Sequence, residues 1–281
     1  MQEILQDHHI SISIGGRPIR NLRFADDIDL TGGSNGELQD LTNRLVDRST
    51  AYGMKVSTAT SKITINSTNN IRADISMNGQ NLEEVTSFNY LGAPLYKGGT
   101  YVAEVRTRIA SAMAAMARLN RIWRCNTISF ASKFKLYNCL VTSILLSGCE
   151  TWTLLADCEK RIQAFETKCL RKRRRISYLE HKTKDWVRIL VGPQGPLLAT
   201  VKRRKLAWFG HVTCHDSLFK TILQGTLKGG RRRGQQRKCW MDNTKELTSL
   251  PMPELLTRAS CRKVWKRISA GSSLMSPPPP Q

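Results

Sequence analysis

The sequence predicts an α+β fold in which a partial antiparallel sheet is followed by helices. Two observations carry this prediction. From residue 10 to 24, and again from 78 to 92, short apolar runs surround turn residues, which is typical of paired strands. From Val102 onward, apolar residues recur at steps of three and four, which is the spacing of one helix face.

The first predicted hairpin carries two adjacent acidic residues. Isoleucines alternate with serines before Gly15 and Gly16, and apolar residues then continue to Asp26 and Asp27. Burying a negative charge costs free energy unless a cation compensates it. Neighbouring carboxylates at a hairpin tip are suitable ligands for a pair of Mg²⁺ ions. The alternative is a solvated acidic turn, because aspartate is common in turns. The apolar residues of this stretch are Ile10, Ile12, Ile14, Ile19, Leu22 and Phe24.

A helix and further strands are predicted after this hairpin. Ser34 and Glu37 have the spacing of a capping box, and Gly53 is placed to end the helix. Lys62 then lies in a short Ser/Thr-rich strand, and Asn78-Gly79 predicts a tight hairpin. The predicted apolar face of the helix consists of Leu38, Leu41, Leu45 and Tyr52.

This order resembles the reverse transcriptases of non-LTR (LINE-type, RTE-like) retrotransposons over nearly the whole chain. The resemblance implies that residues 1–95 are part of a polymerase palm and that Phe24-Ala25-Asp26-Asp27 is its aromatic-x-Asp-Asp box. It implies Asp26 and Asp27 as catalytic metal ligands and Lys62 as the lysine near the leaving pyrophosphate, although Ile63 stands where the family has a small polar residue. The alternative for Lys62 is a solvated strand lysine. The resemblance also implies a primer-grip hairpin at Phe88, Tyr90, Leu91 and Gly92, for which plain core packing is the alternative.

The activity that the resemblance implies is RNA-directed DNA polymerisation by two-metal nucleotidyl transfer. Such an enzyme needs a further aspartate and the fingers upstream, and Met1 lies only 25 residues before Asp26. We therefore expect Mg²⁺ binding only in the complete enzyme, and expect this chain to be inactive without its missing N-terminal part. Two alternatives stay open: a non-catalytic RNA- or DNA-binding module, and a decayed element without function.

The charge distribution favours a nucleic-acid partner. The net charge is +22; residues 1–95 hold 8 basic and 11 acidic side chains, and residues 96–281 hold 36 and 11. Such a surface binds polyanions with strong salt dependence, and the expected partners are RNA and DNA as a template–primer duplex. An anionic membrane is the competing partner, but there is no run of 18 apolar residues and no visible signal peptide. We expect a nuclear or cytoplasmic protein; the sequence does not predict its oligomeric state.

Residues 96–190 are predicted to be helical. The expected helices start at Val102, span residues 131–146 and span residues 158–179. The resemblance implies a thumb that holds the duplex, while an ordinary helical bundle with solvated arginines fits the periodicity equally well. Five successive cations cover all sides of the third helix and repel one another. We expect nearby phosphates or acidic side chains to compensate these charges. These cations are Arg171, Lys172, Arg173, Arg174 and Arg175.

Residues 197–270 are predicted to be a small, basic, mostly helical extension after a Gly/Pro-rich linker at 192–196. Its cations lie beside Trp208, Phe209 and Trp240, so phosphate pairing combined with base stacking is one interpretation. The other is a small aromatic core with a flexible basic tail. The cations expected to bind nucleic acid are Lys202, Arg203, Arg204, Arg231, Arg232, Arg233, Arg237 and Lys238.

The eight cysteines predict neither a disulfide framework nor a zinc site. No C-x-x-C pair is present, and reduced thiols are expected without a signal peptide. His211, Cys214 and His215 are close in sequence, but a structural zinc site needs a fourth ligand, and Cys239 is remote. Residues 271–281 form a proline-rich segment that is expected to be unfolded.

Overall fold

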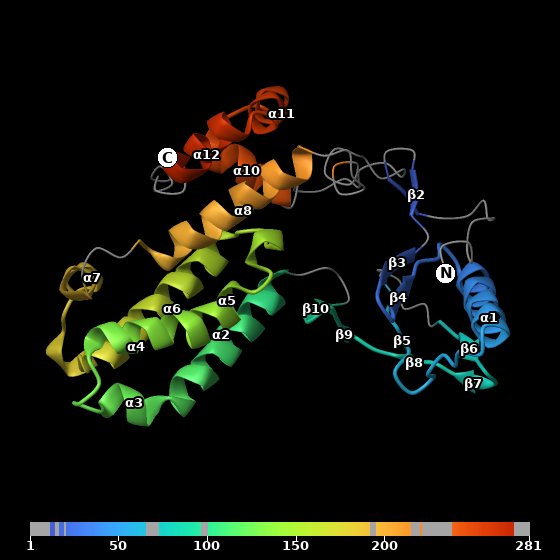
Figure 1. Ribbon diagram of the computed structural model, residues 1–281, viewed down its shortest axis with the longest axis horizontal. Helices are drawn as coiled ribbons and strands as arrows, with labels where there is room; N and C mark the ends of the chain where they lie inside the picture. The colour runs from blue at the N-terminus through green and yellow to red at the C-terminus, as the bar shows by residue number, and fades with distance from the viewer. Residues whose placement is uncertain are drawn as a thin grey trace. The chain divides into compact units, whose positions relative to one another are not determined.

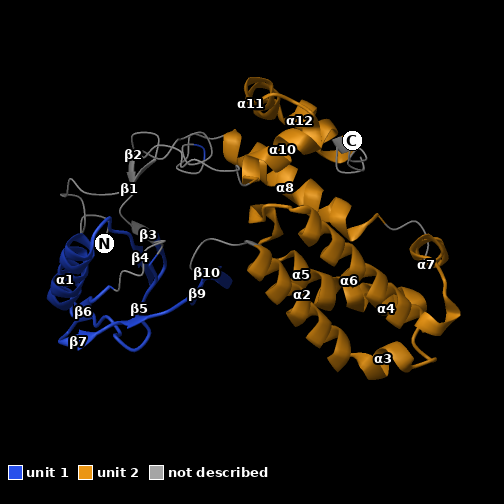
Figure 2. Cartoon of the chain, turned by 180° about the vertical axis from the view of Figure 1, so that it is seen from behind, with its two compact units in different colours: residues 1–100, 218–233 blue, residues 101–217, 234–281 orange. Residues whose placement is uncertain are grey.

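The computed structural model describes residues 12–14, 17–19, 21–65, 73–96, 101–191, 195–214, 220 and 238–272. The chain divides into two compact units, residues 1–100 with 218–233 and residues 101–217 with 234–281 (Figures 1 and 2). The first unit combines strands with one long helix and the second is helical, so the predicted α+β class is confirmed.

The described strands of the first unit form five two-stranded sheets. Four pairs are antiparallel, as predicted, and β5 with β8 is parallel. That parallel pair, with Lys62 opposite Glu83 and Ile63 opposite Glu84, is a difference from the predicted antiparallel sheet. The strands are β1 (Ile12–Ile14), β2 (Arg17–Ile19), β3 (Asn21–Phe24), β4 (Asp27–Leu30), β5 (Lys62–Ile63), β6 (Ser76–Met77), β7 (Gln80–Asn81), β8 (Glu83–Glu84), β9 (Ser87–Tyr90) and β10 (Ala93–Tyr96).

Tight turns close the hairpins of this unit. Asn78 and Gly79 have φ of 53° and 75°, which confirms the hairpin predicted from the Asn-Gly pair. Two further turns among the described residues place ordinary side chains at positive φ, Ala25 at 53° and Leu91 at 49°. A left-handed conformation costs a non-glycine residue about 1 kcal/mol or more, so both turns are strained.

Helix α1 (Asn35–Ala51) begins at the predicted cap. The Ser34 hydroxyl accepts the Glu37 N–H at 3.3 Å, while the Glu37 carboxylate accepts from Gly33 N–H at 2.8 Å. Leu41 and Leu45 are buried as predicted, but Tyr52 is 67% exposed. The prediction for Tyr52 was wrong because the helix has already ended at Ala51, before Gly53 at φ of 69°.

The second unit is built from helices around a main apolar core, with a smaller separate cluster at Leu170, Ile176 and Val187. They are α2 (Tyr101–Arg118), α3 (Asn120–Arg124), α4 (Phe130–Leu136), η2 (Tyr137–Thr142), α5 (Ser143–Leu146), η3 (Cys149–Thr151), α6 (Ala156–Arg174), η4 (Tyr178–Glu180), α7 (Lys184–Val191), α8 (Leu197–Thr213), α10 (Trp240–Thr248), α11 (Met252–Ser260) and α12 (Arg262–Ser272).

This core joins the two helical regions that the sequence places on either side of residues 192–196. Met116, Trp123 and Trp152 are fully buried, and Leu197 and Val201 of α8 belong to the same cluster. Helix α8 also packs against α6, η3 and α12. The described part of residues 197–270 therefore shares one compact unit with residues 101–191.

Two predicted helices differ in detail from the structure. The segment predicted over residues 131–146 is helical, but its centre, η2, is a π-helix. The helix predicted to reach Leu179 ends at Arg174, because Arg175 adopts a left-handed φ of 57°. Leu179, the last residue of the predicted helix, is 85% exposed. Among the described residues, no helix has both the length and the apolar character needed to cross a membrane.

Candidate functional site

The acidic pair lies at the tip of the β3–β4 hairpin. Phe24 pairs with Asp27 across the hairpin, and Ala25 and Asp26 form the two-residue turn. Both aspartates are exposed. The structure thus places the predicted metal ligands on a strand end with their carboxylates open to solvent.

A third carboxylate, Asp29, shares a strand face with Asp27. Residues two apart on a strand point to the same side, and Asp29 lies two positions along β4 from Asp27. Burial raises the pKa of the Asp29 carboxyl. We did not predict Asp29 as a site residue, although the two-residue period of a strand was a sufficient signal.

The predicted primer-grip hairpin lies close to these carboxylates. Burial, the charge of Asp29 and the charge of Asp27 all raise the pKa of the Tyr90 hydroxyl. Along β9, Phe88 and Tyr90 are half-buried while Ser87 and Asn89 are exposed, so the two rings share one face. Leu91 and Gly92 form the exposed turn, with φ of 49° and 76°. Two hairpins that are distant in sequence are therefore close enough for their charges to interact.

The residues present fit part of a magnesium site. Mg²⁺ prefers carboxylate oxygens and substrate phosphates, and the exposed oxygens of Asp26 and Asp27 meet that preference. Within the part of the chain that the structure describes, no three His, Cys, Asp or Glu side chains are grouped as a metal site. The hairpin tip thus offers an incomplete ligand set.

Lys62 is engaged with a glutamate. Its ammonium forms an ion pair with Glu83 at 2.5 Å, across the register of β5 and β8. In the described residues, no hydrogen bond or ion pair links Lys62 to Asp26 or Asp27. A role for Lys62 at a pyrophosphate would require this ammonium to leave Glu83.

The five successive cations of α6 are mostly occupied within the protein. Arg171 donates to the carbonyls of Ser177 and Lys182, Arg174 to that of Leu190, and Arg175 to that of Trp123. Each of these three arginines thus donates to a backbone carbonyl, and their contact with nucleic-acid phosphates stays a prediction. Lys172 is half-buried.

Arg173 differs from its neighbours because aromatic rings surround it. It is 3% exposed, and its guanidinium carbon lies 4.2 Å from the Tyr137 ring centroid and 5.2 Å from that of Phe134. Burial lowers the pKa of Arg173. This cation is inside the unit and is not displayed on a surface.

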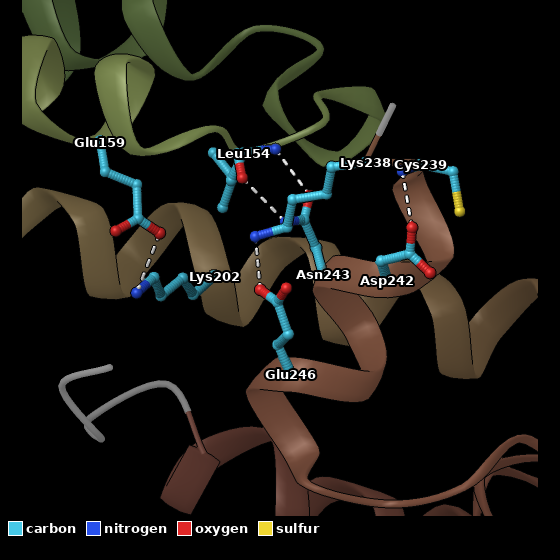
Figure 3. Close-up of polar contacts among 8 residues, drawn as sticks. All are labelled: Leu154, Glu159, Lys202, Lys238, Cys239, Asp242, Asn243 and Glu246. Carbon is cyan, nitrogen blue, oxygen red and sulfur yellow. Dashed lines mark hydrogen bonds and ion pairs between the residues drawn. The ribbon is translucent and has the colours of Figure 1, made fainter. Parts of the chain in front are cut away.

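The cations at the start of α8 also serve packing. Lys202 is buried and pairs with Glu159 at 3.2 Å (Figure 3), while Arg204 donates to the Leu146 carbonyl at 3.1 Å. Lys205 is 0% exposed and donates to the Trp152 carbonyl at 2.7 Å. Arg203 is exposed. Arg204 is exposed as well, so both arginines of this run have the open placement expected of a surface phosphate contact.

The aromatic residues of the extension form a cluster. Phe209 is 0% exposed, and the Trp240 ring lies 5.3 Å from Trp208 and 6.2 Å from Phe209, centroid to centroid. The Trp240 indole N–H donates to the Glu150 carbonyl at 2.8 Å. These contacts favour the predicted small aromatic core over base stacking for Phe209 and Trp240.

Most of the remaining predicted basic cluster lies outside the residues that the structure describes. Arg231, Arg232, Arg233 and Arg237 lie outside the described residues, as do residues 273–281 of the tail predicted at 271–281. The first two residues of that predicted tail belong to α12 instead. Lys238 is described, and its ammonium contacts Glu246 at 2.5 Å (Figure 3).

The cysteines are free thiols. Burial raises the pKa of Cys149 and of Cys169, each to about 12, so both thiols are protonated at neutral pH. Cys214 and His211 are on the surface of α8, and His215 lies outside the described residues.

The sequence has a relative among known proteins. It is 25% identical over 274 residues to a transposon-derived protein of Caenorhabditis elegans, a match that covers 91% of this chain and 96% of the relative. No family profile matches the chain. No solved structure matches it either.

Proposed function

We propose that this chain is the metal-binding and duplex-holding part of an RNA-directed DNA polymerase of transposon origin. One observation carries the proposal: the charges of Asp27 and Asp29 act on Tyr90, so the acidic hairpin is within electrostatic range of the β9–β10 hairpin. A polymerase needs such a placement, because the metal ligands must lie beside the primer end. The transposon-derived relative supports the origin.

Each hairpin has a distinct role in this proposal. Asp26 and Asp27 hold Mg²⁺, which when bound supplies charge that stabilises the oxygens of a phosphoryl displacement. Tyr90 and Leu91 contact the primer terminus, and the helical second unit contacts the duplex. Since the described ligand set is incomplete, nucleotide transfer needs a further carboxylate. We expect no Mg²⁺-dependent primer extension by the purified chain, and robust extension would contradict this expectation.

Iron-directed backbone cleavage tests the metal site without requiring polymerase activity. Fe²⁺ bound in place of Mg²⁺ generates hydroxyl radicals with ascorbate and peroxide, and these cut the polypeptide nearby. With a template–primer duplex present, we expect cuts close to Asp26 and close to Tyr90, mapped by mass spectrometry. The double change Asp26→Asn and Asp27→Asn should remove both sets of cuts.

Asp40→Asn is the matched control, because Asp40 is an exposed aspartate of α1 in the same unit. It should leave the cleavage pattern unchanged. Cuts that persist in the double variant, or that avoid both hairpins in the wild-type chain, would overturn the proposed metal site.

A non-catalytic RNA- or DNA-binding module is the second candidate function, and the strongly basic region from residue 96 onward favours it. Filter binding to a duplex across a salt series separates the two. Both candidates predict that neutralising Arg231, Arg232 and Arg233 weakens binding and flattens the salt slope. They differ for Asp26→Asn: the polymerase proposal predicts weaker iron-directed cleavage at the two hairpins with nearly unchanged duplex binding, whereas the module predicts no iron-directed cleavage there in either protein.

A further inference from the structure

The second unit contains a polar cavity of about 240 Å³ that the proposed function does not use. Its walls come from the π-helix η2, the C-terminal half of α6 and the start of α8. Asn138 and Gly195, which line it, are exposed, so the cavity opens to the surface. Tyr137, Thr142, Glu166 and Arg173 line its buried side.

Arg173 is the buried cation of this cavity. In the described part of the chain, none of its three guanidinium nitrogens has a hydrogen-bond acceptor. The rings of Tyr137 and Phe134 cover the guanidinium face but provide no acceptor for its edge. A guanidinium carries five N–H donors, and leaving them unsatisfied in a buried site costs free energy. The site therefore lacks an acceptor, and an anion would supply one.

The nearest acidic side chain does not fill this need. Glu166 is close enough to act on Arg173 electrostatically. Its two oxygens, however, accept from the Leu197 N–H at 2.8 Å and from the Arg188 guanidinium at 3.4 Å. Because Glu166 is committed to the start of α8 and to α7, the positive charge of Arg173 is left for another partner.

Two hydroxyls add donors to the same cavity. Tyr137 and Thr142 are five residues apart, and the wide π-helical turn brings both to the cavity wall. Each hydroxyl oxygen is buried, and neither has a partner of good hydrogen-bond geometry within the described residues, although the two hydroxyls are close enough to interact with each other. A π-helix inserted into an α-helix is frequently found at functional sites. Its local geometry here places two hydroxyls beside an unsatisfied guanidinium.

We propose that this cavity binds a phosphate group. A carboxylate offers two oxygens, whereas a phosphate offers three or four to a guanidinium and two hydroxyls. The positive end of the α8 dipole at Leu197 also favours an anion there. The guanidinium nitrogens are covered in this conformation, so binding involves a movement of Arg173 from the Tyr137 ring toward the anion. The group is either free orthophosphate or the terminal phosphate of an oligonucleotide.

Calorimetric titration of the full chain with orthophosphate tests the proposal, with ionic strength held constant by NaCl. We expect one saturable site in the wild-type chain. Tyr137→Phe and Thr142→Val each remove one donor to a charged group and should raise Kd about tenfold. Arg173→Gln should abolish binding. Arg203→Gln is the control, because Arg203 is an exposed cation of the same unit outside the cavity, and Kd should be unchanged.

The absence of a saturable site in the wild-type chain would overturn the proposal. So would an Arg203→Gln effect as large as those of the two hydroxyl variants, since binding would then reflect surface charge. If Arg173→Gln fails to fold by circular dichroism, Tyr137→Phe and Thr142→Val decide the question by the same criteria.

Competition by oligonucleotides identifies the source of the phosphate. Displacement of orthophosphate by a 5′-phosphorylated oligonucleotide, and not by its 5′-hydroxyl counterpart, assigns a terminal phosphate. Displacement by neither assigns free phosphate. Equal displacement by both would overturn the proposal, because backbone phosphates on the protein surface would explain it. The cavity variants lie far in sequence from Asp26 and should leave the iron-directed cuts unchanged.

Discussion

Neighbouring cations on α8 have opposite environments. Lys202 is 5% exposed and pairs with Glu159 of α6, whereas the next residue, Arg203, is exposed. Removing one member of a buried ion pair leaves the other charge unanswered, while removing an exposed cation leaves packing intact. Lys202 therefore has a structural role, whereas its neighbour Arg203 has a surface role.

This difference predicts separate effects of Lys202→Gln and Arg203→Gln. Because the Glu159 carboxylate retains some solvent contact, we expect Lys202→Gln to lower the free energy of unfolding by about 2 kcal/mol, less than for a fully buried pair. Arg203→Gln should change it by less than about 0.5 kcal/mol but weaken duplex binding at low salt. Urea unfolding and filter binding measure the two effects. The reverse assignment of effects would show that Arg203, not Lys202, is the structural cation.

Lys205 is a fully buried lysine that contacts a backbone carbonyl and an aromatic ring. Its ammonium donates to the Trp152 carbonyl and lies 3.9 Å from the centre of the Trp240 ring. Burial lowers the pKa of Lys205 to about 6, against weaker opposing effects of Cys239 and Cys149. The side chain links η3, α8 and α10, three elements that are separate in sequence.

The pKa of Lys205 predicts a dependence of stability on pH. Between pH 6 and the unfolded-state pKa of 10.5, the unfolded chain binds a proton that the folded chain does not. The free energy of unfolding should therefore rise with pH in this window, by up to about 1.4 kcal/mol per unit from this group, and the contribution should be constant below pH 6. Urea titrations from pH 6.5 to 8.5 measure the slope. Lys205→Met should reduce it, and identical slopes for both proteins would contradict the assignment.

Close contact between two helices depends on one glycine. Gly210 of α8 faces Trp265 of α12, and a Cβ at this position would overlap the indole ring. The same indole N–H donates to the Leu206 carbonyl at 2.7 Å, and its ring lies 5.2 Å from that of Phe209. Helix α12 is thus held on α8 by a contact that leaves no room for a methyl group.

Gly210→Ala should disrupt the docking of α12. Overpacking a tight core costs about 1–3 kcal/mol, and here the obstacle is a buried ring and not a flexible chain end. Gly36→Ala is the matched control, because Gly36 lies in the first turn of α1 with no neighbouring atom within 4 Å of an added Cβ. It should leave stability unchanged or raise it. Differential scanning calorimetry compares the stability of the two variants. Equal effects would mean that Trp265 moves away from an added methyl group without loss of stability.

Helix α10 is tied to the unit by an amide that imitates backbone pairing. The buried Asn243 side chain accepts from the Leu154 N–H at 2.6 Å and donates to the Leu154 carbonyl at 2.8 Å (Figure 3). Together with Trp240, this contact fixes α10 beside residues 150–154. The C-terminal helices of the described part are therefore integral to the second unit.

The two units differ in how much apolar surface they bury. The second contains a continuous core with several fully buried aromatic and aliphatic side chains. Buried apolar residues in the described part of the first unit form small separate clusters around Leu41 and around Ile75. Stability follows buried apolar area, so the two units should open with different free energies.

Hydrogen exchange followed by mass spectrometry tests this difference. Amides of α2 and α6 should exchange slowly, and those of β3–β4 and β9–β10 should exchange at least about tenfold faster. A bound template–primer duplex with Mg²⁺ should slow exchange in the two hairpins if the proposed function is correct. Equal protection of all four elements in the free chain would mean that the two units unfold together.

Local rules were sufficient for much of the secondary structure. The Ser34 cap, the Asn78-Gly79 hairpin and the start of α2 were predicted from the sequence because each depends on residues only a few positions apart. The position of Asp26 and Asp27 at a hairpin tip was also predicted from residues close in sequence.

The roles of the cations required the tertiary structure. The sequence of a basic run does not show whether its side chains contact phosphates, carbonyls or aromatic rings. The partners here are distant in sequence: Arg175 donates to the carbonyl of Trp123, Arg204 to that of Leu146 and Lys205 to that of Trp152. The effect of the Asp27 and Asp29 charges on Tyr90 is equally non-local. Charge and strand period are properties of adjacent residues, whereas the acceptor that a basic side chain contacts depends on how distant parts of the chain fold together.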